Sequence, residues 1–208
     1  MKKIDNGLLI SLEGVDGSGK STLASALSQE LLKKNLPVVL TKEPGGTPLG
    51  DLIRPLVLQR TCRIDPKAEY LLFAAGRAQH FDELVLPALS RGAIVISDRM
   101  ADSSLVYQGY GRGLDVSTLE AINRWAMSER TPDITFYLRL SIDQALERIT
   151  LRNKSITDFE EKELLQKSIK GFEEILNHKP HVITLNAMET PQTLLEQALT
   201  AVLAHRRR

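Results

Sequence analysis

The sequence predicts an α/β fold built on a five-stranded parallel sheet with helices on both faces. Short apolar runs alternate with longer helical patterns along 208 residues, with no internal repeat and no linker. The runs are short and rich in β-branched or aromatic side chains, as strands buried on both faces require. Polar residues follow several of these runs directly. We therefore expect one domain over residues 1–208, with its ligands at the carboxyl ends of the strands.

Five apolar runs are the expected strands. They cover residues 8–12, 37–41, 93–97, 134–138 and 181–185. Helical patterns cover residues 20–35, 66–90, 116–128, 142–153, 158–177 and 191–205. In the first of these helices, Leu23, Leu27 and Leu31 would share one buried face. Because strand–helix–strand connections between parallel strands are right-handed crossovers, the helices would cover both faces of the sheet.

Composition argues against several classes of function. Lys and Arg total 27 and Asp and Glu total 26, and a net charge of +1 argues against a nucleic-acid partner or a membrane surface. No run approaches the roughly 20 apolar residues of a membrane span, and the N-terminus does not have the pattern of a signal peptide. The single cysteine, Cys62, leaves no intrachain disulfide and is expected to be a small, at least partly buried residue. We therefore expect a soluble cytoplasmic protein.

A phosphate-binding loop follows the first predicted strand. Its sequence fits G-x-x-x-x-G-K-[ST] at every fixed position, between a buried strand and an amphipathic helix. The glycines allow the backbone to approach an anion closely, at the N-terminus of the helix. Lys20 would contact the β- and γ-phosphates, and the Ser21 hydroxyl would bind Mg²⁺. The motif thus predicts a nucleotide site made of Gly14, Val15, Asp16, Gly17, Ser18, Gly19, Lys20 and Ser21.

Asp16 needs its own explanation, because a carboxylate beside bound phosphates is electrostatically unfavourable. Mg²⁺ or a sugar hydroxyl of a second substrate could offset its charge. Alternatively, this loop position simply tolerates an aspartate. The residues alone leave both interpretations open.

Polar residues after the next two strands indicate a second ligand site. Glu43 lies in the turn Lys42-Glu43-Pro44-Gly45-Gly46, at the end of the second strand. Asp98 and Arg99 follow the third strand, where a carboxylate can hold Mg²⁺-bound water and an arginine can bind phosphate. A plain turn and a polar pair that caps a strand are the alternative interpretations.

Two helical pairs are suited to binding a base. Phe73 and Arg77 are four residues apart, so a ring and a guanidinium would share one helix face. Such a pair can stack on a planar base and bond to its edge or its phosphate. Ser104 and Gln108 have the same spacing and offer both donors and acceptors. For the first pair, a core phenylalanine beside an exposed arginine is the alternative.

Five motifs in one order carry a resemblance to a known family. They are Glu13-Gly-Val-Asp-Gly-Ser-Gly-Lys-Ser21, Glu43-Pro-Gly-Gly46, Leu72-Phe-Ala-Ala75 with Arg77, Asp98-Arg99, and Asp102-Ser-Ser-Leu-Val-Tyr-Gln-Gly109. Over nearly its whole length the chain resembles the bacterial thymidylate kinases, which are P-loop nucleoside monophosphate kinases. The resemblance implies transfer of the γ-phosphoryl group of MgATP to dTMP, giving dTDP and ADP for dTTP synthesis. It also implies a homodimer.

The resemblance assigns the phosphate end of the acceptor site. Arg54 and Arg99 would bind near the acceptor phosphate, and Glu43 would help to organise that end. Asp16 would contact the acceptor's 3′-hydroxyl or the metal region.

The resemblance also assigns the base end. Phe73 would stack on thymine, and Arg77 would reach its edge. Ser104 and Gln108 would read the polar edge of the pyrimidine, while Tyr107 would crowd C2′ so that a 2′-hydroxyl fits poorly.

One departure from the family concerns its short mobile lid, expected here at about residues 148–160. Members usually carry an Asp-Arg pair ahead of the long helix, where this chain has Asp158-Phe159. Arg152 is therefore the expected lid cation, and Arg148 and Lys154 are the alternative residues. The alternative interpretation is that this segment forms an ordinary solvated basic face. The expected catalytic residues are Lys20, Arg99, Asp16 and Arg152.

No general base is expected for this reaction. The acceptor phosphate has a second pKa of about 6, so it is largely ionised at neutral pH. Catalysis would consist of aligning two anions and neutralising them with Mg²⁺ and cations. Two alternatives stay open: a kinase for another monophosphate or a nucleoside, and a nucleotide-dependent switch protein. The Asn-Lys-x-Asp motif with which GTPases read their base is absent from the sequence.

Overall fold

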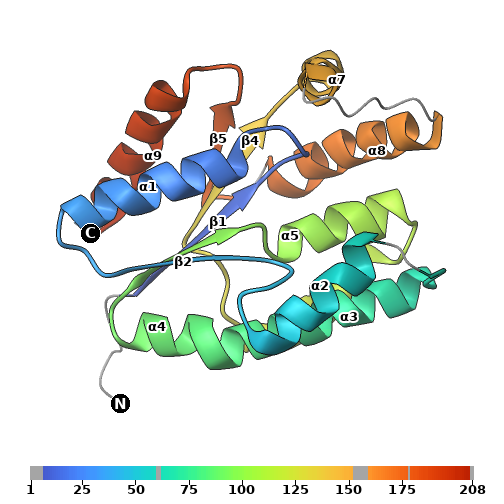
Figure 1. The fold of residues 1–208 in the computed structure, drawn as a ribbon, viewed down its shortest axis with the longest axis horizontal. Coiled ribbons are helices and arrows are strands. Elements are labelled where there is room, and N and C mark those ends of the chain that lie inside the picture. The colour runs from blue at the N-terminus through green and yellow to red at the C-terminus, as the bar shows by residue number, and fades with distance from the viewer. Residues whose placement is uncertain (1–6, 60–61, 152–158, 178, 207–208) are drawn as a thin grey trace.

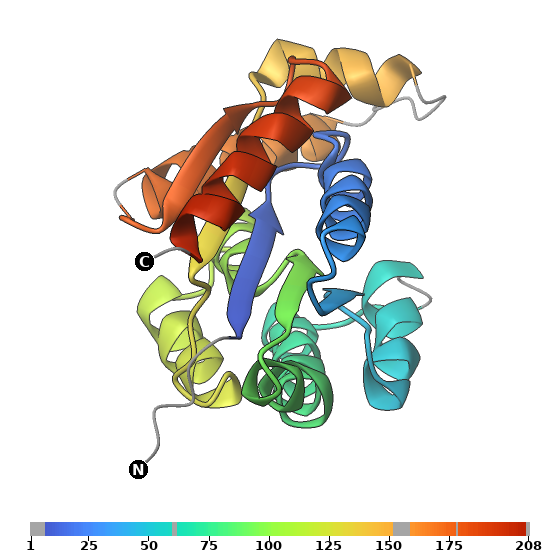
Figure 2. The ribbon, with the colours of Figure 1, turned by 90° about the vertical axis from the view of Figure 1, so that its left-hand side faces the viewer.

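The computed structural model of the protein describes residues 7–59, 62–151, 159–177 and 179–206. Within these ranges five strands form one parallel sheet: β1 (Leu8–Glu13), β2 (Val38–Lys42), β3 (Ile94–Asp98), β4 (Ile134–Arg139) and β5 (Val182–Asn186). Their order is β2-β3-β1-β4-β5, and Figure 2 shows β1 at the centre, between β3 and β4. Each strand lies within one residue of its predicted bounds, which confirms the parallel α/β class.

Helices connect the strands. Along the described residues they are α1 (Lys20–Lys33), α2 (Pro48–Gln59), α3 (Pro66–His80), α4 (Leu86–Ser90), α5 (Ala101–Ser104), α6 (Val116–Ala126), α7 (Ile142–Leu151), α8 (Phe159–Leu176) and α9 (Pro191–His205). The π-helical segment η1 (Phe81–Val85) joins α3 to α4, and a second one, η2 (Leu105–Gly111), extends α5. A proline at the first turn and a side-chain cap start both α3 and α9: Asp65 accepts from Lys67 N, and Thr190 accepts from Thr193 N.

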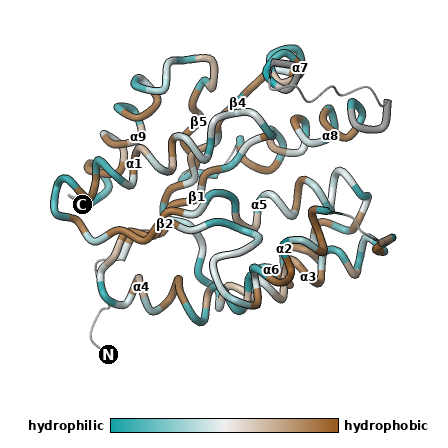
Figure 3. The backbone as a smooth tube through the Cα atoms, viewed as in Figure 1, coloured by the Kyte–Doolittle hydropathy of each residue, from teal (hydrophilic) through white to brown (hydrophobic). Residues whose placement is uncertain are grey.

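The helices cover both faces of the sheet. Ile10 of β1 lies in a core cluster with Leu27 of α1 and Val202 of α9, and Figure 1 shows these two helices together on one face. Leu9 points the other way and packs with Phe81 of η1, because successive strand residues face opposite sides. Figure 3 shows hydrophobic residues concentrated in the strands. The inner strands are buried, but the edge strands β2 and β5 are only partly buried, so the expectation of burial on both faces is wrong for these two. The site is built at the ends of β1, β2 and β3.

Three features differ from the sequence-based expectations. Helix α2 was not expected, because Pro55 lies inside it and a proline usually interrupts a helix interior. The helical stretch predicted over residues 66–90 is continuous, but η1 forms its middle. Cys62 is exposed, so the expectation of a buried residue is wrong. Among the described helices, none has the length and hydropathy of a membrane span.

Candidate functional site

The phosphate loop joins β1 to α1, and its first glycine cannot be replaced without strain. Gly14 has a φ of 140°, and a Cβ there would lie 2.7 Å from the carbonyl oxygen of Leu138 on β4. Gly19 adopts a left-handed conformation as the N-cap residue of α1. The loop therefore ends at a helix N-terminus, where free backbone N–H groups favour an anion.

Lys20 is a buried lysine at the start of α1. Only 6% of the residue is exposed, and its Nζ donates to the carbonyl oxygen of Val15 at 2.8 Å. Burial, and then the positive charge of Arg99, lower the pKa of Lys20 to about 7. A bound polyphosphate would supply negative charge to this ammonium, as a phosphate-binding lysine requires.

Ser21 and Asp98 are neighbours across the loop and the end of β3. The Ser21 hydroxyl donates to Asp98 Oδ2, and both residues line the cavity described below. Hydroxyl and carboxylate oxygens are ligands that Mg²⁺ accepts alongside phosphate oxygens and waters. The described residues contain no cluster of three or more His, Cys, Asp or Glu that could hold a metal ion alone. This donor set fits a magnesium ion that arrives with a nucleotide.

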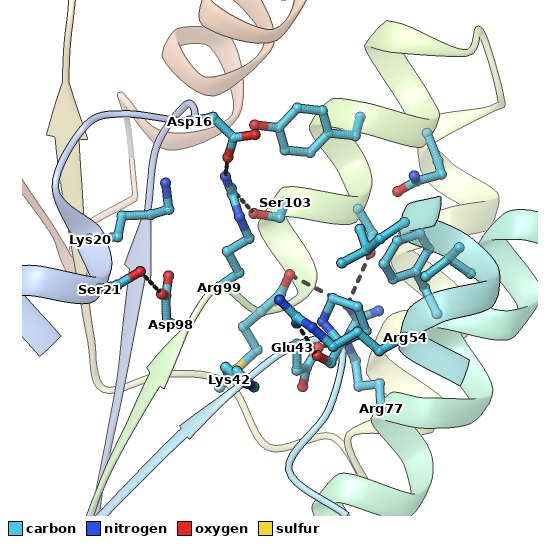
Figure 4. A pocket seen from close by; sticks show the side chains of 18 of the residues that line it. Asp16, Lys20, Ser21, Lys42, Glu43, Arg54, Arg77, Asp98, Arg99 and Ser103 are labelled. Carbon is cyan, nitrogen blue, oxygen red and sulfur yellow. Dashed lines mark hydrogen bonds and ion pairs between the residues drawn. The ribbon is translucent and has the colours of Figure 1, made fainter. Parts of the chain in front are cut away.

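Arg99 links the phosphate loop to the second-ligand side of the site. Its Nη2 lies 2.5 Å from Asp16 Oδ1, and its Nη1 donates to the Gly14 carbonyl and to Ser103 Oγ at 2.9 and 3.1 Å. The guanidinium lies 5.2 Å from the centroid of the Tyr107 ring. Figure 4 shows Arg99 directed at Asp16. The charge of Asp16 is thus offset by Arg99. Neither of the two interpretations of Asp16 drawn from the sequence included this ion pair.

Glu13, at the end of β1, is a buried carboxylate for which sequence reasoning gave no role. Its Oε1 accepts from the backbone N–H of Met100 at 2.8 Å, and its Oε2 accepts from Ser103 Oγ at 2.5 Å. Glu13 therefore holds the residue after Arg99 and one of the side chains that Arg99 contacts. Burial, and then the charge of Asp102, raise the pKa of Glu13 to about 7. Its position directly before the loop glycine was the signal available in the sequence.

Arg77 and Glu43 lie against each other rather than at opposite ends of the site. Arg77 is 2% exposed, and its Nε donates to Glu43 Oε2 at 2.8 Å. Its other nitrogens donate to Asn123 Oδ1 at 2.6 Å and to Ser104 Oγ at 2.9 Å. His80 Nδ1 lies 3.0 Å from the second Glu43 oxygen. Burial would raise the pKa of Glu43, but Arg77 and His80 hold it below its ordinary value.

Two further predicted residues, Gln108 and Arg54, lie with Arg77 and Glu43 along the wall of the cavity described below. Gln108 Nε2 donates to Glu69 Oε1 at 2.9 Å, and Arg112 binds the other oxygen of Glu69 at 3.2 Å. Arg54 Nη1 donates to the Pro44 carbonyl at 2.6 Å. Sequence reasoning assigned no function to Glu69, Arg112 or Asn123, because their partners lie far away in the chain.

A cavity of about 710 Å³ brings these residues together. The predicted site residues that line it are Asp16, Gly17, Gly19, Lys20, Ser21, Glu43, Arg54, Phe73, Arg77, Asp98, Arg99, Ser104, Tyr107 and Gln108. Gly14, Val15 and Ser18 complete the loop, and the last two are buried beneath it. Lys42 also lines the cavity and is a cation that the sequence analysis did not select. Figure 4 shows Lys20 and Arg77 on opposite sides of this space.

The lid prediction can be followed only in part. Arg152, Lys154 and Asp158 lie outside the described residues, and the predicted segment 148–160 is described only at its two ends. Arg148 is described, and its guanidinium donates to the carbonyls of Gly17 at 3.3 Å and Ala187 at 2.6 Å. This arginine therefore lies against the phosphate loop.

The chain is similar to known proteins of one family. A family model described as thymidylate kinase matches residues 12–198. The thymidylate kinase of Halothermothrix orenii is 50% identical over 142 residues, which cover 68% of this chain and 69% of that protein. The thymidylate kinase of Chlorobaculum parvum is 40% identical over 208 residues, covering 95% and 96%. The crystal structure of thymidylate kinase from Ehrlichia chaffeensis has a TM-score of 0.78 and 31% identity, over 95% of this chain and 99% of that one.

The match extends across both halves of the cavity, from the phosphate loop to the wall of Phe73 and Gln108. The chain belongs to the thymidylate kinase family, whose members transfer the γ-phosphoryl group of MgATP to dTMP.

Proposed function

We propose that the cavity holds both substrates at once, with the ATP phosphates on the loop and dTMP between Arg99 and Phe73. The observation that carries this assignment is the continuity of the space: the phosphate-loop residue Lys20 and the base-side residue Gln108 line the same cavity. Direct transfer between two bound anions needs them in one water-poor space with cations between them. Lys20 and Arg99 both line the loop side of that space.

In this assignment the loop side performs the phosphoryl transfer. Lys20 binds the β- and γ-phosphates, while Arg99 binds the acceptor phosphate and is oriented by Asp16 and Ser103. Ser21 and Asp98 would hold Mg²⁺, which would supply positive charge to the phosphates. Asp16 also reaches the acceptor's 3′-hydroxyl, and the predicted lid cation Arg152 completes the set of charges. No side chain has to remove a proton, since the acceptor is already an anion.

The base side selects the acceptor. Phe73 stacks on thymine, and the polar atoms of Arg77, Ser104 and Gln108 read its edge. Arg54 organises the phosphate end, Glu43 holds Arg77 through their ion pair, and the ring of Tyr107 limits the space near C2′. All of these residues line the cavity, which supports the assignment.

Replacement of Lys20 tests the loop side. We expect Lys20→Ala to lower kcat at least about 100-fold, because it removes a preorganised cation from the transferring group. The matched control is Lys33→Ala, whose side chain is 71% exposed at the other end of the same helix. Coupled measurement of ADP release gives the rates, and circular dichroism checks the fold. Near-normal turnover by a folded Lys20→Ala protein would contradict the assignment.

The proposal includes a homodimer formed through α2, α3 and α6. Large apolar side chains are exposed on each of these helices: Leu52 is 70% exposed, Leu71 is 54% exposed and Trp125 is 79% exposed. Helix α3 packs against both α2 and α6, so the three helices form one side of the molecule. Exposed apolar side chains in such numbers are typical of a surface that another chain covers.

Sedimentation velocity tests the dimer. We expect Trp125→Glu to shift the protein toward monomer, whereas Leu32→Glu, at a residue that is 52% exposed on α1, should not. A monomeric wild-type protein at micromolar concentration would rule out the dimer.

We also propose that the reaction takes place in the cytoplasm. The exposed Cys62 is unpaired, and a reducing compartment keeps such a thiol free. Immunodetection in fractionated cells tests this location, and recovery in a membrane or extracellular fraction would contradict it.

A further inference from the structure

We propose that Glu69 is a specificity-determining residue, which holds the Gln108 amide in one orientation and so makes the site select thymine over cytosine. The inference rests on the proposed function, in which Gln108 reads the edge of the base. Glu69 acts through Gln108, and cytosine is the base that the site rejects.

Glu69 is held on both of its oxygens. Its Oε1 accepts from Gln108 Nε2 at 2.9 Å, and its Oε2 faces Arg112 Nη2 at 3.2 Å. Only 8% of Glu69 and 5% of Gln108 are exposed, so water does not readily replace these contacts. A carboxylate paired with a guanidinium only accepts hydrogen bonds. The NH₂ end of the Gln108 amide must therefore face Glu69, since the opposite orientation would bring two acceptors together.

The orientation of the amide decides what Gln108 presents to the cavity. With its Nε2 directed at Glu69, Gln108 has its own Oε1 available, and no residue in the described part of the chain donates a hydrogen bond to that oxygen. Gln108 lines the cavity, so this oxygen is an acceptor available to a ligand. Without Glu69 the amide could rotate by half a turn and present a donor instead.

Ser104 and Arg77 supply the complementary group. Ser104 Oγ accepts from Arg77 Nη2 at 2.9 Å, so Ser104 keeps its hydroxyl hydrogen and one lone pair for other partners. A guanidinium has no acceptor atom, so the Arg77 end of the site is always a donor. Both residues line the same cavity as Gln108. The cavity thus presents a donor at Arg77, which cannot invert, and an acceptor at Gln108, whose amide could invert if it were not held.

This pattern matches one of the two pyrimidine edges. Thymine presents an acceptor at O4 beside a donor at N3–H, whereas cytosine presents a donor at its amino group beside an acceptor at N3. A fixed donor and a fixed acceptor satisfy thymine at both positions and oppose cytosine at both. If the amide were free to rotate, it could donate to N3 of cytosine and remove half of the penalty. Glu69 therefore contributes to specificity by preventing that rotation.

The test compares dTMP with dCMP as acceptors. Glu69→Gln keeps the size of the side chain but can donate as well as accept, so the Gln108 amide can take either orientation. We expect the ratio of kcat/KM for dTMP to that for dCMP to fall at least about tenfold, a scale set by one hydrogen-bonding position. The kcat at saturating dTMP should change far less than this ratio. Glu163→Gln, on the exposed face of α8, is the matched control and should keep the wild-type ratio.

A double-mutant cycle shows whether Glu69 acts through Gln108. Gln108→Met removes both amide groups and should also lower the ratio. Adding Glu69→Gln to it should then lower the ratio no further, because the orientation it controls no longer exists. Glu69→Asp, which withdraws the carboxylate by one methylene group, carries the same prediction if Glu69→Gln folds poorly.

The results distinguish a failure of the role of Glu69 from a failure of the proposed function. A wild-type protein that strongly prefers dTMP, with an unchanged ratio in Glu69→Gln or an additive double mutant, would overturn this inference alone. A wild-type protein without dTMP-dependent ADP release would overturn the proposed function and this inference with it.

Discussion

The Nε atom of Arg77 lies 2.8 Å from Oε2 of Glu43, and both side chains are buried in the wall of the cavity. The two residues were expected to serve opposite ends of the acceptor. The ion pair indicates that Glu43 organises the site by holding Arg77, while Asn123 and Ser104 bind the other nitrogens of the guanidinium. A charge network of this kind has direct consequences for stability.

The first prediction concerns removal of one partner of this ion pair. Glu43→Ala leaves the guanidinium of Arg77 buried without its counter-charge, so we expect the free energy of unfolding to fall by about 3–5 kcal/mol. Urea denaturation at pH 7 measures the change. The matched control is Glu163→Ala on the surface of α8, which should change it by less than about 0.5 kcal/mol. A loss below about 1 kcal/mol for Glu43→Ala would show that the pair does not hold this wall together.

The second prediction concerns the pH dependence of that stabilisation. Arg77 and His80 outweigh the effect of burial and hold the pKa of Glu43 below its ordinary value of 4.5. A carboxyl group with a lowered folded-state pKa stabilises the protein above 4.5, and the contribution is lost as the pH falls further. The difference in unfolding free energy between wild type and Glu43→Ala should therefore shrink between pH 5 and pH 3. A difference independent of pH over that range would contradict the lowered pKa.

The third prediction concerns Glu13, whose pKa is shifted in the opposite direction. Burial and the nearby Asp102 raise the pKa of Glu13 from 4.5 to about 7, so the folded state holds a proton that the unfolded state loses. Stability then falls as the pH rises from 4.5 to 7. Glu13→Gln cannot titrate, so its stability relative to wild type should improve from pH 5 to pH 8. Parallel stability curves for the two proteins would refute the raised pKa.

The fourth prediction concerns the phosphate loop. Gly14→Ala places a Cβ 2.7 Å from the Leu138 carbonyl in addition to straining a φ of 140°. Gly113→Ala also strains a positive φ, of 76°, but its Cβ meets nothing within 4 Å. We expect the second variant to lose about 1–2 kcal/mol of stability and keep its ATP affinity, and the first to lose ATP binding as well. Equal ATP affinity in both variants, measured by titration calorimetry, would show that the loop does not need this close approach.

Elements whose local sequence agrees with their packing were predictable. The inner strands β1, β3 and β4 are buried, whereas the edge strands β2 and β5 are only partly buried. All five apolar runs still match the observed strands to within one residue. Helix α9 begins and ends where predicted, since Pro191 follows the capping Thr190. Helix α2 was missed because Pro55 contradicts its local pattern, and packing against α3 overrides that signal.

The site was predictable where a contiguous motif encodes it and not where tertiary contacts complete it. The phosphate loop lies within a single run of eight residues, so its residues were identified from spacing alone. Gln108 depends on Glu69, 39 positions earlier, and Arg77 depends on Asn123, 46 positions later. No local pattern connects residues so far apart, which is why Glu69 and Asn123 were not assigned functions.

The central claim is that one cavity joins an ATP site to a site for dTMP. The most direct test is ADP release from MgATP across a panel of acceptors: dTMP, dUMP, dCMP, dAMP, dGMP, thymidine and none. The account predicts the highest kcat/KM with dTMP, with one dTDP formed for each ADP. Preference for another acceptor, or ADP release that does not depend on an acceptor, would contradict it.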